Sequence, residues 1–230
     1  MKSLIDTRRV ARRARLSNIA SVTGLLALLA SVLVPLFWPG YMAFAYGLMV
    51  AGLGVSMMGI YFANRWVKKP RPEVSLDAAL KSLSGAHRLY HYPSSLPCDH
   101  LLLTPNGLVV LETVNLGSRF TYKNGRWREM IGIGRALRYI VEEHLGDPFK
   151  SATNAAQLLE ERVDQMLEGK SRVPVRAVVV FTHPAAQIDV ENPPVPACML
   201  EKLKKHVQIQ GPRLEQAAYE QVASYLDGLI

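Results

Sequence analysis

The chain has 230 residues and a formal net charge of +8. Residues 1–63 contribute +5 and residues 64–71 contribute +4, which leaves −1 for residues 72–230. A nearly neutral larger part argues against a broad surface that binds polyanions. Only Cys98 and Cys198 are present, which excludes a disulfide framework and favours a reducing compartment.

Two long apolar stretches follow the basic start of the chain. Residues 16–37 and 41–63 carry no charge, and each is long enough to cross a hydrocarbon core of about 30 Å as a helix. Trp38-Pro39-Gly40 joins them as a tight turn. A signal peptide is the alternative for the first stretch, but the apolar run is too long and a second one follows directly. The sequence therefore predicts a transmembrane helical hairpin over residues 16–63.

Basic residues flank this hairpin on both outer sides. Residues 1–15, a basic N-terminus, and residues 64–72, a basic linker, are rich in Arg and Lys, whereas the turn between the spans has none. The positive-inside rule then places both ends in the cytoplasm. We expect a multi-pass protein of the cell inner membrane, with anionic lipid headgroups as partners of the basic flanks.

Small residues recur every four positions in both spans, a pattern that lets two helices approach closely in lipid. The alternative is the frequent use of Gly and Ala that is typical of membrane helices. The residues concerned are Ala20, Gly24 and Leu28 in the first span and Ala43, Gly47 and Ala51 in the second.

Residues 73–230 mix strand and helix patterns and are expected to form one cytoplasmic α/β domain. In chain order, we expect a helix capped by Ser75, a hairpin within residues 98–115, a strand pair around Asn124-Gly125, a helix at 154–167, a buried strand at 175–181, a short strand at 195–199, and helices at 200–207 and 214–226.

Asp99 and Glu112 stand at the outer ends of the expected hairpin. If Pro105-Asn106 forms a type II turn, the two carboxylates lie directly opposite each other. If Asn106-Gly107 forms a type I′ turn, they are diagonal neighbours. Either turn places them on one face, where two carboxylates about 5 Å apart can share a divalent cation. The alternative is a pair of solvated residues at ordinary strand ends.

The string at residues 99–112, DHLLLTPNGLVVLE, resembles the core of the nuclease-related domain, NERD. That family is similar to the PD-(D/E)XK nucleases, in which an Asp and a Glu bind Mg²⁺ and a Lys helps to orient water. The resemblance extends over about residues 73–207, through Asp147-Pro148-Phe149-Lys150 and Val178-Val179-Val180-Phe181. It implies a restriction-endonuclease-like mixed sheet flanked by helices, behind the transmembrane hairpin.

The resemblance also implies a set of site residues. Asp77, Asp99 and Glu112 are the expected ligands of Mg²⁺ or Mn²⁺, and nucleic acid is the expected substrate. The chain departs from the family at Val114, where the family has its Lys, and at Ser151, where it tends to have Gln.

Another cation would have to replace the missing lysine. Lys123, or else Lys81, is the expected substitute, so that Asp99, Glu112 and Lys123 form the expected catalytic set. The sequence thus favours a membrane-anchored NERD-like protein that binds nucleic acid or processes it slowly. The alternative is a catalytically inactive binding or scaffold module.

Some neighbouring residues are expected to be structural. His100 has no second His at ligand spacing, so we do not expect zinc, and Cys98 is expected to be a packing residue. Basic and aromatic residues alternate around the second hairpin, where they either bind a nucleic-acid strand or form an ordinary exposed hairpin. They are Arg119, Tyr122, Lys123, Arg126, Trp127 and Arg128.

Overall fold

A computed structural model describes residues 1–67, 71–130, 145–169, 171–209 and 211–230. The chain divides into two compact units. One, the sheet domain, combines Met1–Asp6 with the described residues from Pro72 onward; the other, the helical hairpin, contains Thr7–Arg71. Residues 68–70 of the predicted linker lie outside the described residues.

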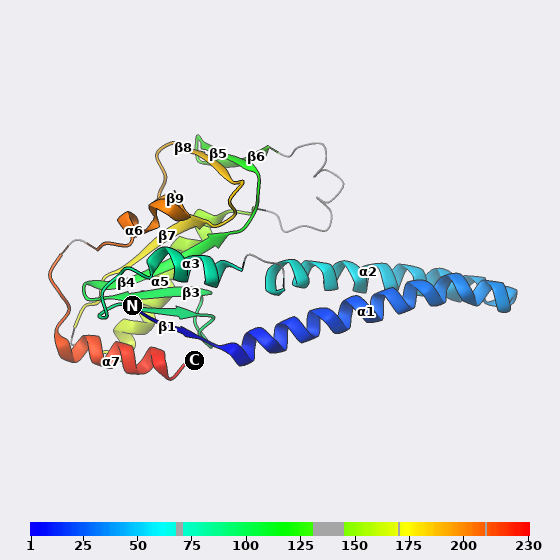
Figure 1. Cartoon of the computed structure of the whole chain (residues 1–230), viewed down its shortest axis with the longest axis horizontal. Coiled ribbons are helices and arrows are strands. Elements are labelled where there is room, and N and C mark those ends of the chain that lie inside the picture. Colours follow the sequence, from blue (N-terminus) through cyan, green and yellow to red (C-terminus); the bar gives the residue numbers. More distant parts are fainter. Residues whose placement is uncertain (68–70, 131–144, 170, 210) are drawn as a thin grey trace. The chain divides into compact units, whose positions relative to one another are not determined.

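The elements of both units can be followed in Figure 1. The helical hairpin consists of α1 (Thr7–Phe37), a short 3-10 turn η1 (Pro39–Tyr41) and α2 (Met42–Trp66). The sheet domain consists of β1 (Lys2–Ile5), α3 (Pro72–Leu80), β2 (Arg88–His91), β3 (His100–Thr104), β4 (Gly107–Val114), β5 (Arg119–Lys123), β6 (Arg126–Met130), α5 (Pro148–Met166), β7 (Val175–Phe181), β8 (Gln187–Val190), β9 (Ala197–Met199), η2 (Leu200–Lys202), α6 (Leu203–His206) and α7 (Gln216–Asp227).

A six-stranded mixed sheet in the order β1-β2-β3-β4-β7-β9 forms the centre of the sheet domain. The pairs β2–β3 and β3–β4 are antiparallel, and the pairs β1–β2, β4–β7 and β7–β9 are parallel. Apolar side chains of α5 and α7 pack on one face, and those of α3 and α6 pack on the other. The predicted mixed sheet flanked by helices is thus confirmed.

Two helices begin earlier than their apolar periodicity predicts, each at a proline; for the second, the family resemblance already has Asp147-Pro148-Phe149-Lys150 entering a helix. The first turn of α3 contains Pro72, so Ser75 lies inside the helix and does not cap it. Helix α5 starts at Pro148, where the side chain of Asp147 accepts a hydrogen bond from the Lys150 backbone N–H (3.1 Å). Proline suits the first turn because its fixed φ is helical and its missing N–H would be unpaired there.

The central parallel strand and the second hairpin follow the predictions. Strand β7 spans Val175–Phe181, and its last five residues are buried. Asn124 and Gly125 both have positive φ, 52° and 74°, and connect β5 to β6 as the two-residue turn that the sequence indicates.

Strand β1 is not expected from the sequence. Lys2–Ile5 pairs in parallel with Arg88–His91, and the backbone N–H of Asp6 continues the contact to the His91 carbonyl (3.2 Å). An edge strand that is largely exposed needs no alternation of apolar and polar residues, so the sequence of this segment carries no strand pattern. The first six residues therefore belong to the sheet domain, and the predicted basic N-terminus continues from Thr7 into α1.

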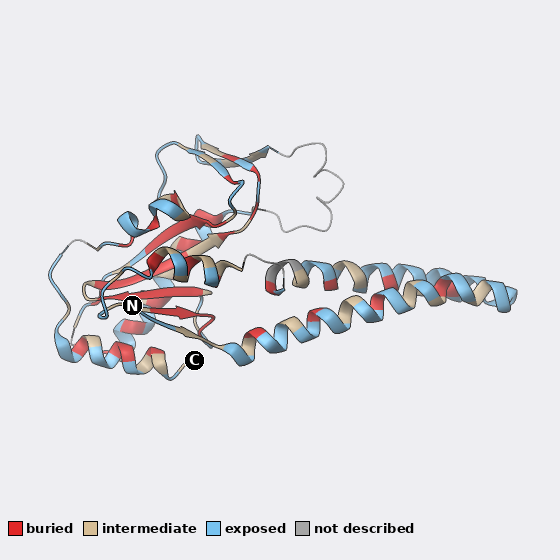
Figure 2. Cartoon of the chain, in the orientation of Figure 1, coloured by how far each residue is buried: buried red, intermediate tan, exposed pale blue. Residues whose placement is uncertain are grey.

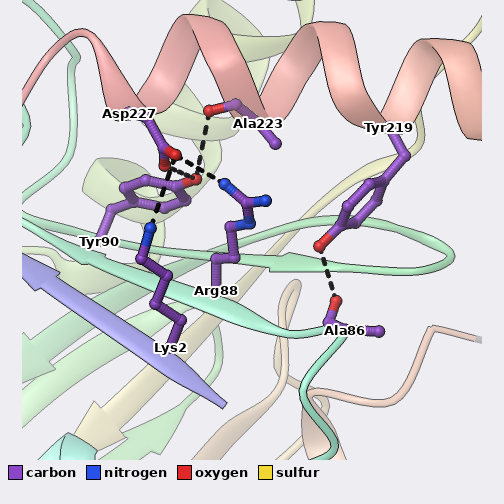
Figure 3. A network of polar contacts seen from close by, with 7 residues as sticks. All are labelled: Lys2, Ala86, Arg88, Tyr90, Tyr219, Ala223 and Asp227. Carbon is purple, nitrogen blue, oxygen red and sulfur yellow. Dashed lines mark hydrogen bonds and ion pairs between the residues drawn. The ribbon is translucent and has the colours of Figure 1, made fainter.

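Helix α7 holds β1 and β2 through one carboxylate, Asp227 (Figure 3). This group accepts hydrogen bonds from Arg88 (2.6 Å) and from the Tyr90 hydroxyl (2.7 Å), and it lies 3.8 Å from Lys2 Nζ. Burial first, and then the hydrogen bond to Asp227, raise the pKa of Tyr90. The two ends of the described chain are thus joined across the sheet edge.

Strand β1 precedes the helical hairpin in the sequence and β2 follows it, yet the two strands pair in one sheet. Both outer ends of the hairpin are therefore connected to the same domain. Only Asp6 separates the end of β1 from the start of α1. The hairpin is therefore an insertion between β1 and α3. If α1 and α2 cross a membrane, both of their outer ends must emerge where the sheet domain folds.

We expect Asp227→Ala to loosen β1. The change leaves the buried Tyr90 hydroxyl with only a long contact to the Ala223 carbonyl (3.4 Å), and it removes the partner of Arg88. Loss of such a partner destabilises by about 1–3 kcal/mol. Hydrogen exchange of the β1 amides in the full-length protein should accelerate by about tenfold or more. Glu220→Ala, on an exposed position of α7, should leave exchange unchanged; equal effects of both changes would contradict the assignment.

In the helical hairpin, α1 and α2 contact each other through positions seven residues apart. The buried positions are Val10, Ser17, Gly24 and Ser31 in α1 and Ala45, Gly52, Gly59 and Trp66 in α2. Ser17 donates a hydrogen bond to the Gly59 carbonyl (3.0 Å), and Arg13 lies over the Trp66 ring, 5.3 Å from its centre. A seven-residue spacing is the repeat that keeps one seam between two supercoiled helices.

The predicted four-residue stripe is wrong in α2. Ala43, Gly47 and Ala51 are exposed, and a Cβ atom added at Gly47 would meet nothing within 4 Å. In α1, by contrast, Gly24 is buried in the contact. A stripe repeating every four residues turns around the helix, so it leaves the contact seam after a few residues.

Both helices are long and apolar enough to cross a membrane. Only 11% and 17% of their apolar windows are buried, unlike the core helices of soluble proteins. The remaining surface exposes large side chains such as Val32, Leu36 and Val50, and Figure 2 shows these outward surfaces as mostly exposed. This pattern fits helices whose outer surface meets lipid.

Candidate metal centre

The hairpin that carries Asp99 and Glu112 turns at Pro105-Asn106. Thr104 pairs with Gly107 and Leu101 pairs with Val110, so the first predicted register is confirmed and the Asn106-Gly107 turn is wrong. The expected type II geometry is also wrong, because Asn106 keeps a negative φ.

The positive φ falls instead on Gly107, at 144°. A Cβ atom there would overlap the Pro174 carbonyl oxygen, which accepts a hydrogen bond from the Leu108 N–H (2.9 Å). Glycine is needed at this position for both reasons, and the close approach fixes the start of β4 beside β7.

Continued two residues beyond its last pair, Leu101 with Val110, this register would set Asp99 opposite Glu112. The backbone of Asp99 is still paired, since its carbonyl accepts a hydrogen bond from the Tyr92 N–H (2.6 Å). Glu112 alternates with Val110 and Val114, which belong to the core on the α5 face. Both carboxyl residues are half-buried, so solvent reaches them.

The pKa of the Cys98 thiol depends on the charges of this carboxylate pair. Burial first, and then the charges of Asp99 and Glu112, raise the pKa of its thiol to about 12. The two carboxylates therefore act on the same buried group. Cys98 is 6% exposed and lies in the core cluster, as expected for a packing residue.

Asp77 lies on the other face of the sheet. Its helix, α3, packs Leu76 and Leu80 against the core cluster opposite to that of Val110. The Asp77 carboxylate contacts His91 Nε2 (3.2 Å). Burial alone would raise the pKa of Asp77, but hydrogen bonds from His91 and Ser3 and the charge of His91 outweigh it, so the pKa is lowered. The structure does not bring Asp77 to the face of Glu112.

A second histidine stands beside His100, contrary to the sequence-based expectation. His91 is its cross-strand partner, and their Nδ1 atoms lie 2.8 Å apart. Both rings are buried, on the face that α3 covers. Eight residues lie between the two histidines in the sequence, a separation that is no local ligand spacing.

Glu73 is the buried carboxylate that the sequence does not indicate. It stands in the first turn of α3, is 2% exposed and accepts a hydrogen bond from the Tyr92 hydroxyl (3.1 Å). Tyr92 thereby links this turn to the backbone of Asp99. A helix start placed at Pro72 would have revealed it, because Glu73 is then the first-turn acid.

The two cations considered as replacements for lysine lie elsewhere. Lys123, at the end of β5, forms ion pairs with Asp189 (3.4 Å) and Glu191 (2.7 Å). The hydrogen bond to Glu191 is the main reason that the pKa of Lys123 is raised. Lys81 follows the last residue of α3 and is exposed. Neither lysine forms an ion pair with Glu112.

Tyr122 and Trp127, the two aromatic residues of the alternating pattern, pack against Phe149, with centroid distances of 4.6 and 4.7 Å. Both are partly buried against the core beneath α5.

The side chains near this pair limit the kind of metal ion that the site can hold. In the part of the chain that the structure describes, no group of three or more His, Cys, Asp and Glu side chains could hold a metal ion. Asp99 and Glu112 nevertheless bring two carboxylates close to one buried thiol, that of Cys98. Mg²⁺ is often held by one or two carboxylates with several waters retained, so the pair fits a partly hydrated hard cation.

These features define a mixed α/β domain with an opposed carboxylate pair at the end of a β-hairpin. Residues 73–182 match the family model described as NERD, nuclease-related domain, and this part of the chain is a nuclease-related domain. No curated protein and no solved structure matches the chain. Strand β1 and helix α7 both lie outside the matched residues.

Proposed function

We propose that this protein is a membrane-anchored nuclease-related protein that binds nucleic acid and hydrolyses it slowly with a divalent cation. The observation that carries the proposal is that Asp99 and Glu112, in the matched domain, both act on the Cys98 thiol and lie on adjacent strands whose register, continued outward, opposes them. The family resemblance supports nucleic acid as the substrate. The two long apolar helices support the anchor.

Asp99 and Glu112 would hold Mg²⁺ or Mn²⁺. Such an ion polarises a phosphoryl oxygen and lowers the pKa of bound water, which is the chemistry that phosphodiester hydrolysis requires. Asp77 is left out of this ligand set because of its place on the opposite face. Val114, two residues beyond Glu112, is 7% exposed and aliphatic, so it neither donates a hydrogen bond nor carries charge.

We expect slow hydrolysis because Val114 stands where the family has its lysine. An electrostatic donor at the developing oxyanion is worth about 3–4 kcal/mol in typical enzymes. The same observation favours the second candidate function, a catalytically inactive module that binds nucleic acid or another protein at the membrane. The two candidates differ in metal binding and in residual hydrolysis.

The membrane orientation is part of the proposal. Both ends of the helical hairpin would face the cytoplasm of an inner membrane, where the basic flanks meet anionic headgroups. The shared side is supported by the β1–β2 pairing. The choice of the cytoplasmic side rests on the distribution of Arg and Lys alone.

Metal binding is the direct test. Calorimetric titration of the full-length protein in detergent with Mn²⁺ should give one site, and Asp99→Asn or Glu112→Gln should weaken it by about 100-fold. Asp77→Asn is the matched control, because it removes the same charge on the other face, and it should change affinity less than threefold. Binding that survives Asp99→Asn, or that is lost with Asp77→Asn alone, would contradict the proposed site.

A further inference from the structure

The second, three-stranded sheet has two chemically different faces. Its strand order is β6-β5-β8. On the inner face, Phe120, Tyr122 and Trp127 pack toward α5 and β7. Because side chains alternate along a strand, the intervening residues of β5 and β6 project from the other face. The second sheet thus turns its aromatic residues toward the core and exposes its basic ones.

Four cations occupy this outer face. The register pairs Lys123 with Arg126, Thr121 with Arg128, and Arg119 with Met130 across β5 and β6. The four cationic residues are exposed. Lys123 forms ion pairs with Asp189 and Glu191, but among the described residues Arg119, Arg126 and Arg128 form none. Four cations and two carboxylates give this cluster a net charge of +2, in a domain whose total charge is near neutral.

This sheet is tied to the strand that carries Glu112. Only four residues separate Val114 from Arg119. The Gln187 N–H donates to the Ser118 carbonyl (3.0 Å), and the Thr182 N–H donates to the Val114 carbonyl (3.0 Å). Backbone hydrogen bonds therefore connect β8 to the β4–β5 segment and β4 to the end of β7. The cationic face belongs to the same framework as the carboxylate pair.

We propose that the outer face formed by Arg119, Arg126 and Arg128 docks the phosphodiester backbone of a nucleic-acid duplex. The inference rests on the proposed function and specifies the form of its substrate. Proteins that prefer single strands stack bases on exposed aromatic rings, and here the rings lie on the inner face, packed against Phe149 and Phe181. Guanidinium groups without aromatic neighbours contact phosphates, which carry no sequence information. Binding is therefore independent of sequence and does not favour single strands.

An anionic membrane surface is the competing partner for arginines. Polybasic segments that bind anionic lipid usually contain four to eight basic residues, whereas here three arginines form no ion pair among the described residues and two carboxylates lie beside Lys123. Surface-bound segments also insert several large apolar side chains, and Met130 is the single large apolar residue on the outer face of β5 and β6. A duplex requires only phosphate contacts, so these observations favour it.

The test measures binding without metal. Full-length protein in nanodiscs of neutral lipid is titrated in EDTA into a fluorescein-labelled 20-base-pair DNA duplex and into a single strand of the same length. Binding is measured by anisotropy at several salt concentrations. The combined variant Arg119→Gln, Arg126→Gln and Arg128→Gln should reduce the slope of log affinity against log salt by about 2.7 for the duplex, since each phosphate contact contributes about 0.9.

The matched control removes the same charge from α6 and its flank. Lys202, Lys204 and Lys205 are exposed, and their combined replacement by Gln should leave the slope nearly unchanged. Because all six side chains are exposed, both variants should keep the unfolding midpoint. Equal slope changes in both variants, no change in either, or tighter binding of the single strand would each overturn the proposal.

Two further arms separate this inference from its alternatives. Asp99→Asn should bind the duplex with an unchanged slope, so failure of the metal site leaves the docking result intact. In nanodiscs with anionic lipid, slower hydrogen exchange of β6 that disappears in the arginine variant, without duplex binding, would assign the face to the membrane. That outcome would overturn the duplex proposal.

Discussion

Val114→Lys should increase hydrolysis of nucleic acid by about 10²- to 10³-fold. Val114 lies two residues beyond Glu112 on the same strand face, so a lysine there projects beside the carboxylate pair. A positioned cation stabilises the charge that develops on the phosphate, and one such donor is worth about 3–4 kcal/mol. Activity is followed with Mn²⁺, full-length protein in detergent, and labelled DNA and RNA substrates.

Burial limits this gain but does not cancel it. Val114 is 7% exposed and belongs to the apolar core, where an unpaired ammonium would be unfavourable. The stem of lysine keeps the apolar contacts, and its head can reach the half-buried Glu112 carboxylate. We therefore expect a lower unfolding midpoint together with higher activity.

Two controls isolate the effect of position. Thr113→Lys adds the same charge one residue earlier, on the opposite face, and should not increase hydrolysis. Val114→Lys combined with Asp99→Asn should lose the gain, because the cation then has no metal site to assist. A folded, Mn²⁺-binding Val114→Lys variant without increased hydrolysis would show that Val114 does not explain the slow reaction.

Gly24→Leu should disrupt the helical hairpin. A Cβ atom at Gly24 would lie 2.6 Å from the Ser56 backbone nitrogen, and a backbone atom cannot move aside as a flexible side chain can. The helices must separate, which breaks the close contact and the hydrogen bond between Ser17 and the Gly59 carbonyl. Overpacking of this kind typically costs about 1–3 kcal/mol, and displaced backbone raises the value.

The measurement is an SDS titration of the full-length protein in mild detergent, followed by circular dichroism. Gly47→Leu is the matched control, because it makes the same change in α2 where nothing lies within 4 Å. We expect the midpoint to fall for Gly24→Leu and to stay unchanged for Gly47→Leu. Equal midpoints for the two variants would contradict the seven-residue contact seam.

Local patterns in the sequence were sufficient for several elements. Uncharged apolar runs of more than twenty residues predict the two long helices, because helix length and polarity are properties of the segment itself. The hairpin turns at Pro105-Asn106, one of the two sites that the sequence allows, and either site keeps Asp99 and Glu112 on one face. The continuous apolar run of β7 likewise predicts a strand buried on both faces.

Other features depend on contacts between distant segments. The position of Asp77 followed from the face of the sheet that α3 covers, which no local pattern encodes. The pairing of His91 with His100 required the register between β2 and β3. The seam between α1 and α2 was set by antiparallel packing, which selects seven-residue positions over the more visible four-residue stripe.

The sequence by itself determined which side chains alternate, where turns form and which helices are long and apolar. Tertiary structure decided which alternate set is buried: in β5 and β6 it turned the aromatics toward α5 and left the arginines outside. It also made Lys2–Ile5 an edge strand, held by Asp227 more than two hundred residues away. The physical reason is that alternation is a property of the extended backbone, whereas burial depends on which distant segment packs against each face.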